Sequence, residues 1–144
     1  LYYLPVVMDL PENVNGDICT KNKCHHCCIE TEMVVTHDDI KRIEQQTGLM
    51  PKEFCLLADD GIRRLKNKES PIGEICYFLD KEGHCSIYNI RPQGCQYYPL
   101  IWDLENHKVI CDDYCPYSSQ FSGYITKKIE DEIEDFIFTI YGFT

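Results

Sequence analysis

Cysteine residues crowd the segment from position 19 to position 30, which reads CTKNKCHHCCIE. Cys24 and Cys27 are separated by two residues, and two thiolates with this spacing in a tight turn can both reach one tetrahedral metal ion at about 2.3 Å. Cys28 follows Cys27 directly, and the side chains of neighbouring residues in extended chain point to opposite faces. The adjacent pair therefore predicts two metal centres, or one polynuclear cluster in which sulfur atoms bridge the metals.

The 10 cysteines of the chain form three groups and one outlier. The nine grouped cysteines are the predicted metal ligands: Cys19, Cys24, Cys27, Cys28, Cys76, Cys85, Cys95, Cys111 and Cys115. A closed zinc site needs only four ligands, so this set predicts more than one zinc ion or an iron–sulfur cluster. Cys55 stands alone in a segment with a helical pattern, and we expect it to be a small buried apolar residue.

Two other interpretations of the cysteines and histidines are open. Disulfide bonds are typical of secreted proteins, but the apolar opening of the chain lacks a basic segment and a small-residue cleavage site. Nine grouped cysteines also cannot all pair with one another. His25 and His26 lie inside the first group and can bind a metal through neutral imidazole, although the abundance of thiolates makes them weaker candidates.

The length and the charge of the chain limit its class. A chain of 144 residues is typical of one domain, here residues 1–144, and can bury about 68–70% of its unfolded surface. The net charge of −10 disfavours nucleic acid and anionic membrane surfaces as partners. The sequence has no long uninterrupted apolar run of the kind that a membrane-spanning helix needs. We therefore expect a cytoplasmic protein whose partner, if it has one, is another protein.

Helical signals occur in three places. Residues 36–48 begin with Thr36, a good N-cap, and end with Gly48, so they predict a short helix. A second short helix is predicted to begin at Pro51 and to include Cys55. From residue 118 to about residue 141, apolar residues recur with a period of 3.6, which predicts a long amphipathic helix packed across a small sheet.

Two β-hairpins are predicted between these helices. Residues 75–92 contain two apolar stretches around DKEG, in which Gly83 can adopt the positive φ of a hairpin loop. Residues 99–113 repeat the scheme around ENH. Together these elements predict an α+β fold: a small single domain with two short N-terminal helices, short β-hairpins that carry a cysteine metal cluster, and a long amphipathic C-terminal helix.

The run CTKNKCHHCC, followed by CYFLDKEGHCSIYNIRPQGCQYYP, resembles the CxxCxxCC-type cysteine-cluster family of zinc- or iron-chelating domains. The resemblance covers about residues 17–116. It implies metal-binding cysteines at Cys24, Cys27, Cys28, Cys76, Cys85 and Cys95, with later ones such as Cys111 and Cys115. Cys19 fits the start of the run with a longer gap, whereas Cys55 matches no family position. Longer relatives include flagellin lysine N-methylases, which use S-adenosylmethionine, so protein-lysine methylation is implied as an alternative activity.

Arg91 lies four residues before Cys95 and is the predicted cofactor-binding cation. Its guanidinium can offset thiolate charge or donate a hydrogen bond to a sulfur atom; the alternative is an ion pair on the surface. Thiolates bind zinc and iron–sulfur clusters alike, so the spacing does not separate the two. The sequence thus predicts a metal-binding protein that holds zinc or iron in a multi-cysteine cluster and acts as a structural or interaction domain. The alternatives are an iron–sulfur redox protein and a component of S-adenosylmethionine-dependent lysine methylation.

Overall fold

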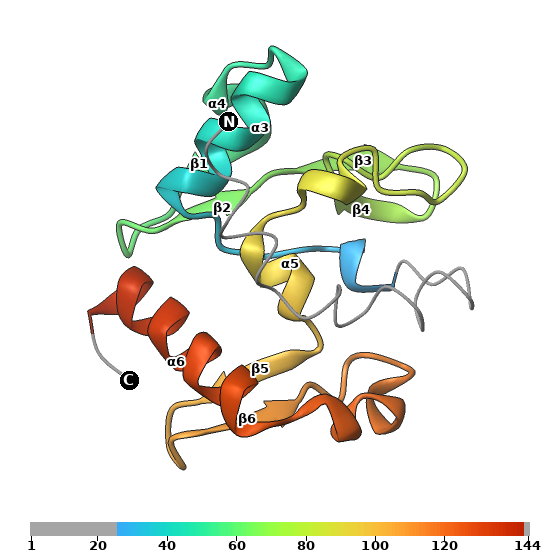
Figure 1. Cartoon of the computed structure of the whole chain (residues 1–144). Helices are drawn as coiled ribbons and strands as arrows, with labels where there is room; N and C mark the ends of the chain where they lie inside the picture. Colours follow the sequence, from blue (N-terminus) through green and yellow to red (C-terminus); the bar gives the residue numbers. More distant parts are fainter. Residues whose placement is uncertain (1–25, 143–144) are drawn as a thin grey trace.

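The computed structural model of the chain describes residues 26–142 and combines helices with short antiparallel β-hairpins (Figure 1). The helices in this part are α3 (His37–Thr47), α4 (Pro51–Phe54), α5 (Gln93–Tyr97) and α6 (Lys127–Tyr141). The strand pairs are β1 (Cys55–Leu57) with β2 (Arg63–Leu65), β3 (Asn67–Ser70) with β4 (Gly73–Cys76), and β5 (Leu100–Asp103) with β6 (Lys108–Cys111). Single 3-10 turns are η1 (His26–Cys28), η2 (Tyr88–Ile90), η3 (Ser118–Gln120) and η4 (Ser122–Tyr124). The mixed α+β class is confirmed.

Helix α3 begins and ends where the sequence predicts. The Thr36 hydroxyl accepts a hydrogen bond from the Asp39 amide at 3.0 Å, and the Asp39 carboxylate accepts one from the Thr36 amide at 2.9 Å. This reciprocal capping box satisfies two amides that the helix itself leaves unpaired. Gly48 closes the helix with φ at 76°, in the left-handed region that favours glycine.

The second predicted helix is wrong beyond its first turn. Helix α4 ends at Phe54, and the chain then extends as β1, in which Cys55 pairs with Leu65. The Phe54 carbonyl accepts a hydrogen bond from the Lys66 amide at 2.8 Å. Pairing with β2 thus supplies the backbone hydrogen bonds that a longer helix would have made. Helix propensity is a weak preference, and this tertiary pairing overrides it.

Only one of the two predicted hairpins is regular. The hairpin over residues 99–113 is confirmed, with Leu100 opposite Cys111. Strand β4, however, pairs back with β3 and not forward into residues 77–92. The forward segment keeps a single bridge between Leu79 and Cys85. The reason lies in Asp80, whose carboxylate accepts hydrogen bonds from two amides of the following turn and so replaces strand pairing with a local loop.

The C-terminal helix is shorter than predicted. Helix α6 begins at Lys127, and residues 118–124 form η3 and η4 instead. Thr126 sets the boundary because its hydroxyl accepts a hydrogen bond from the Ile129 amide at 3.2 Å and caps the helix there. Ile129 and Ile133 are buried in one cluster with Leu100 and Val109 of the β5–β6 hairpin, as the amphipathic pattern predicts. Helix α6 lies beside this hairpin (Figure 1). Within residues 26–142, no helix is long and apolar enough to cross a membrane.

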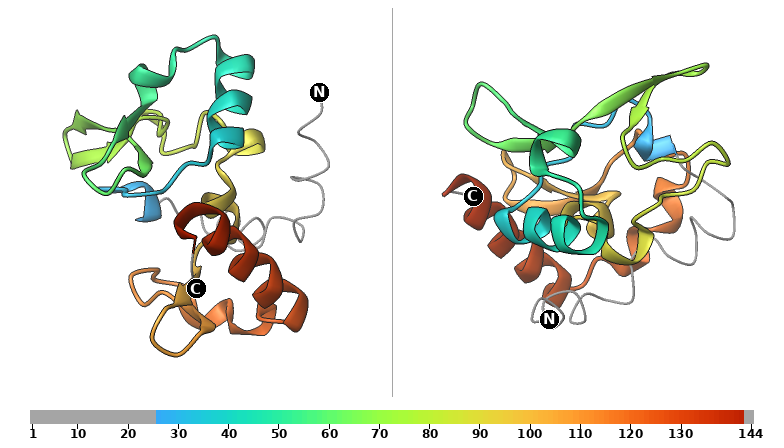
Figure 2. Two further views of the ribbon diagram at one scale, coloured as in Figure 1. Left: turned by 90° about the vertical axis from the view of Figure 1, so that its left-hand side faces the viewer. Right: turned by 90° about the horizontal axis from the view of Figure 1, so that it is seen from above.

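Buried apolar residues gather in two clusters on opposite sides of α5 (Figure 1 and the left view of Figure 2). The first core cluster consists of Val35, Ile40, Ile43, Phe54, Cys55, Leu65, Ile75, Cys76, Phe78, Leu79 and Ile87. The second core cluster consists of Tyr97, Leu100, Val109, Cys115, Phe121, Ile129 and Ile133. Because the cysteines divide between these clusters, the packing decides which thiols can meet.

Candidate metal centre

The adjacent cysteines lie in η1 and not in extended chain. Successive side chains of a 3-10 helix are rotated by about 120°, and the Cys28 thiol forms a hydrogen bond with Cys27. This hydrogen bond is the main cause that lowers the pKa of Cys27 and raises the pKa of Cys28. The prediction that the two side chains diverge is therefore wrong, and the argument for two metal centres loses that support.

Five thiols from four chain segments lie within electrostatic reach of one another. The hydrogen bond with Cys27 and burial are the main causes that raise the pKa of Cys28. Charge on Cys27, Cys76 and Cys95 raises it further. Burial raises the pKa of Cys95, and charge on Cys27, Cys76 and Cys85 raises it further. These residues are termed the five-thiol cluster: Cys27, Cys28, Cys76, Cys85 and Cys95. The structure thus brings together the first two predicted groups, as far as they lie within residues 26–142.

Backbone pairing explains how distant segments reach this place. A bridge between Ile29 and Ile75 places η1 beside the end of β4, which carries Cys76. The bridge between Leu79 and Cys85 returns the following loop to the same end of β4. Helix α5 contributes Cys95. A 3-10 turn, the end of a strand, a loop and a short helix therefore carry these thiols.

Burial controls the protonation of these thiols. It is the main cause that raises the pKa of Cys76, to about 11, and it also raises the pKa of Cys85. A thiolate withdrawn from water is unfavourable unless a positive charge lies beside it. At neutral pH Cys76 and Cys85 therefore keep their protons in the absence of a metal. A metal cation reverses the preference, because it binds the thiolate and releases the proton.

Arg91 supplies positive charge to the five-thiol cluster. It is only 6% exposed, so the alternative of a surface ion pair is wrong. Its guanidinium lies over the Tyr88 ring at 4.0 Å, and its Nε donates a hydrogen bond to the Tyr88 carbonyl at 2.9 Å. After the larger effects of burial and hydrogen bonding, the charge of Arg91 acts to lower the pKa values of Cys27, Cys85 and Cys95.

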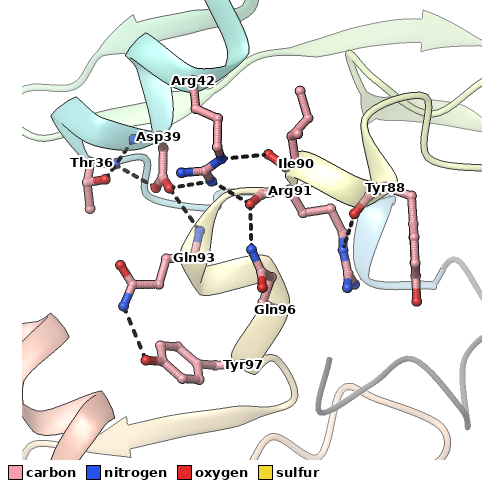
Figure 3. A network of polar contacts seen from close by, with 9 residues as sticks. All are labelled: Thr36, Asp39, Arg42, Tyr88, Ile90, Arg91, Gln93, Gln96 and Tyr97. Carbon is pink, nitrogen blue, oxygen red and sulfur yellow. Dashed lines mark hydrogen bonds and ion pairs between the residues drawn. The ribbon is translucent and has the colours of Figure 1, made fainter. Parts of the chain in front are cut away.

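A buried ion pair holds the main chain on both sides of Arg91 (Figure 3). Asp39 is 1% exposed, and its Oδ1 accepts hydrogen bonds from Arg42 Nη2 and from the Gln93 amide, each at 3.0 Å. The same Nη2 donates to the Arg91 carbonyl at 2.7 Å, which also accepts a hydrogen bond from Gln96 Nε2 at 3.0 Å. These contacts tie α3 to the segment that carries Arg91 and leads into Cys95.

The sequence analysis missed this network. The sequence feature that could have indicated this network is the position of Asp39 and Arg42. They adjoin Ile40 and Ile43, which form the apolar side of α3. Charged residues that adjoin an apolar helix face are usually solvated. Here they are buried as a pair, which only long-range partners in the segment after η2 make favourable.

Cys111 and Cys115 belong to the second core cluster and not to the five-thiol cluster. Burial raises the pKa of Cys111, and the charge of Asp113 raises it further. Tyr98 is close enough to Cys27 of the five-thiol cluster and to Cys115 of the second core cluster for the charge of each to affect it. Burial and its hydrogen bond to Asp112 raise its pKa, and charge on both Cys27 and Cys115 adds to this effect. That Cys111 and Cys115 bind metal stays a prediction.

Four other residues of the sequence prediction are Cys19, Cys24, His25 and Cys55. Cys19, Cys24 and His25 lie outside the described residues. Cys55 is buried, as predicted, but it begins β1 and donates a hydrogen bond from Sγ to the Pro51 carbonyl at 3.2 Å. Burial raises its pKa, and the charged groups near it are Arg63 and Lys66. It therefore stands apart from the five-thiol cluster.

The donor set fits zinc or iron by its chemistry. All eight cysteines in the described part of the chain are free thiols, which excludes disulfides among them. Between residues 26 and 142, no three histidine, cysteine or acidic side chains are already placed as ligands of one ion. Buried and half-buried thiols near one guanidinium are nevertheless a soft donor set with a compensating charge, which zinc and iron–sulfur clusters prefer. Cys27 and Cys28 would be joined by Cys76, Cys85 and Cys95 in holding the metal.

Two alanine substitutions distinguish a ligand from a bystander. We expect Cys28→Ala to lower the metal-to-protein ratio and the thermal midpoint, because structural metal binding can supply about 10–16 kcal/mol in small zinc peptides. Cys55→Ala should keep the full metal content and cost about 1–2 kcal/mol of unfolding free energy, as a typical buried point mutant does. Elemental analysis and thermal unfolding of both variants beside the parent measure this. Equal metal loss in the two variants would show that the division of the cysteines is wrong.

Comparison with known proteins supports metal binding in general. Residues 18–116 match the family model CxxCxxCC, described as "Putative zinc- or iron-chelating domain". Neither the curated proteins nor the solved structures give a match. The matched region contains the whole five-thiol cluster and Arg91, and it covers more than half of the chain. The chain therefore belongs to the CxxCxxCC family of zinc- or iron-chelating domains.

Proposed function

We propose that this protein holds zinc or iron through the five-thiol cluster, completed by Cys24 and Cys19 from the preceding segment. The observation that supports the proposal is the convergence of five buried or half-buried thiols from four segments near one buried guanidinium. The family description supports metal binding in general. Cys27 and Cys28 contribute from η1, Cys76 from β4, Cys85 from the following loop, and Cys95 from α5.

Charge balance supports a metal over five unreactive thiols. A buried guanidinium is stabilised by negative charge close to it. Thiolates bound to a metal are one source of such charge. Four thiolates around one divalent zinc ion leave a net charge of about −2, of which Arg91 offsets one unit. The same residue would therefore neutralise part of the centre.

The role that this arrangement favours is structural. A metal held by these thiols would join η1, β4, the loop after β4 and α5, which are otherwise connected by isolated bridges and single turns. Zinc supplies a redox-inactive cross-link, and its binding free energy adds directly to folding. We therefore propose a structural or interaction domain, whose outer surface is free to bind another protein.

Iron in an iron–sulfur cluster is the second candidate, since all the proposed donors are sulfur atoms. Protein purified without oxygen separates the two cases by elemental analysis and an absorption spectrum. Zinc predicts zinc in the analysis and no visible absorption. An iron–sulfur cluster predicts iron, sulfide and visible absorption that bleaches on reduction. Protein that takes up neither metal, after reconstitution with each under reducing conditions, would contradict the proposed function.

Arg91 gives a second test that does not remove a ligand. We expect Arg91→Gln to weaken metal binding by about 10–100-fold, as loss of a group that supports the ligands typically does. Arg91→Lys should recover part of the affinity because it keeps the charge. The matched control is Arg63→Gln, which removes an exposed guanidinium on β2. Competition against a chelator measures all three variants, and similar affinities for Arg91→Gln and Arg63→Gln would contradict the role of Arg91.

A further inference from the structure

A pocket of about 350 Å³ lies where residues of the two core clusters meet. Its walls combine Ile29 and Met33, which pack against the first core cluster, with Leu100 and Ile133 of the second core cluster. Strand β5 and helix α6, which lie side by side, form one wall (Figure 1). The volume is within the range of about 300–1,000 Å³ that is typical of small-molecule sites. Neither the proposed metal centre nor the packing of either core cluster accounts for this space.

Aromatic side chains from several elements line this pocket. They come from the end of α5, from β5, from the segment after β6 and from α6: Tyr97, Tyr98, Trp102, Tyr114, Phe136 and Tyr141. The rings of Tyr97 and Phe136 are in contact, with their centroids 5.7 Å apart, so each helps to hold the other in place. The face of an aromatic ring carries negative partial charge and attracts cations, quaternary ammonium groups in particular. The walls therefore favour an organic cation over an anion.

Three carboxylates line the same pocket. Asp112 is half-buried, and two pocket residues hold it: its Oδ2 accepts a hydrogen bond from the Tyr98 hydroxyl, and its Oδ1 accepts one from the Tyr114 amide at 3.1 Å. Glu30 and Glu32 are exposed, so they line the pocket where it opens to solvent. Negative charge is thus present both at the mouth of the pocket and deeper in its wall.

No positive side chain balances these carboxylates within the described lining, which contains no lysine, arginine or histidine. Arg64 lies near Glu32 and Tyr141, but it is held by Asp60 in a two-pronged ion pair at 2.9 and 3.0 Å. An inorganic cation such as calcium needs several oxygen ligands close together, and within residues 26–142 no three acidic, histidine or cysteine side chains are placed in that way. An organic cation with apolar substituents matches both the charge and the walls.

We propose that this pocket binds a small organic cation whose nitrogen carries apolar substituents, such as a quaternary ammonium compound. Its alkyl groups would contact the aromatic and aliphatic walls, and the carboxylates would offset its positive charge. The proposal does not depend on the metal, because Cys27 is the single member of the five-thiol cluster in the described lining. Failure of metal binding and failure of this pocket are therefore separate results.

Three probes of nearly the same shape test the preference for positive charge. They are choline, its carbon isostere in which a neutral tert-butyl group replaces the trimethylammonium group, and the anion tert-butylacetate. Trp102 is the only tryptophan of the chain and lines the pocket, so its fluorescence reports binding. At a fixed ionic strength, we expect choline to change the emission saturably and to bind at least about tenfold more tightly than the isostere, with tert-butylacetate the weakest. Equal binding of choline and the isostere, or no saturable change with choline, would overturn the proposal.

Two double substitutions separate the pocket from the general attraction of a chain with a net charge of −10. Glu30→Gln combined with Glu32→Gln removes two carboxylates of the pocket. Glu44→Gln combined with Glu105→Gln removes two exposed carboxylates outside its lining, so both variants change the net charge equally. We expect the first variant to weaken choline binding about threefold or more and the second to leave it unchanged. Equal effects of the two variants would overturn the proposal.

A second pair of variants tests the aromatic walls. Tyr114 lines the pocket, whereas Phe138 is 59% exposed and does not. Tyr114→Leu should weaken choline binding about 2–5-fold through loss of a cation–π contact, and Phe138→Leu should leave it unchanged. Circular dichroism confirms that each variant is folded. If Tyr114→Leu binds choline as tightly as Phe138→Leu does, the proposed aromatic recognition is wrong.

Discussion

The ion pair between Asp39 and Arg42 is the contact on which the position of the thiols depends. It is buried, and such a pair stabilises a fold only when its remaining donors and acceptors are satisfied. Here the partners are main-chain groups of residues 90–93, so the pair fixes the path of the chain into α5. That path decides where Arg91 and Cys95 lie relative to η1 and β4. A polar network inside α3 thereby sets the geometry of a site that α3 does not itself line.

The five-thiol cluster and Arg91 are coupled through charge. When no metal is bound, burial favours the protonated form of thiols such as Cys76. In the proposed metal-bound state the thiols would become thiolates, and the guanidinium of Arg91 would offset part of their charge.

Local signals in the sequence predicted the elements that depend on local contacts. The capping box of Thr36 and Asp39 and the hairpin over residues 99–113 are of this kind, because turn and cap residues determine them. Long-range contacts determined what was missed. Cys55 extends into β1 because β2 pairs with it. Cys27 and Cys28 lie in a 3-10 turn, which their spacing did not indicate. Spacing grouped the cysteines, but only the packing of two core clusters separates Cys115 from Cys76.

The central claim is that sulfur atoms of the five-thiol cluster surround the metal, and X-ray absorption at the metal edge tests it most directly. The measurement uses the full chain, purified without oxygen and with its native metal. The account predicts a first shell of sulfur atoms, at about 2.3 Å if the metal is zinc. A first shell made mainly of nitrogen or oxygen atoms would contradict the account, because the buried thiols would then not be the ligands.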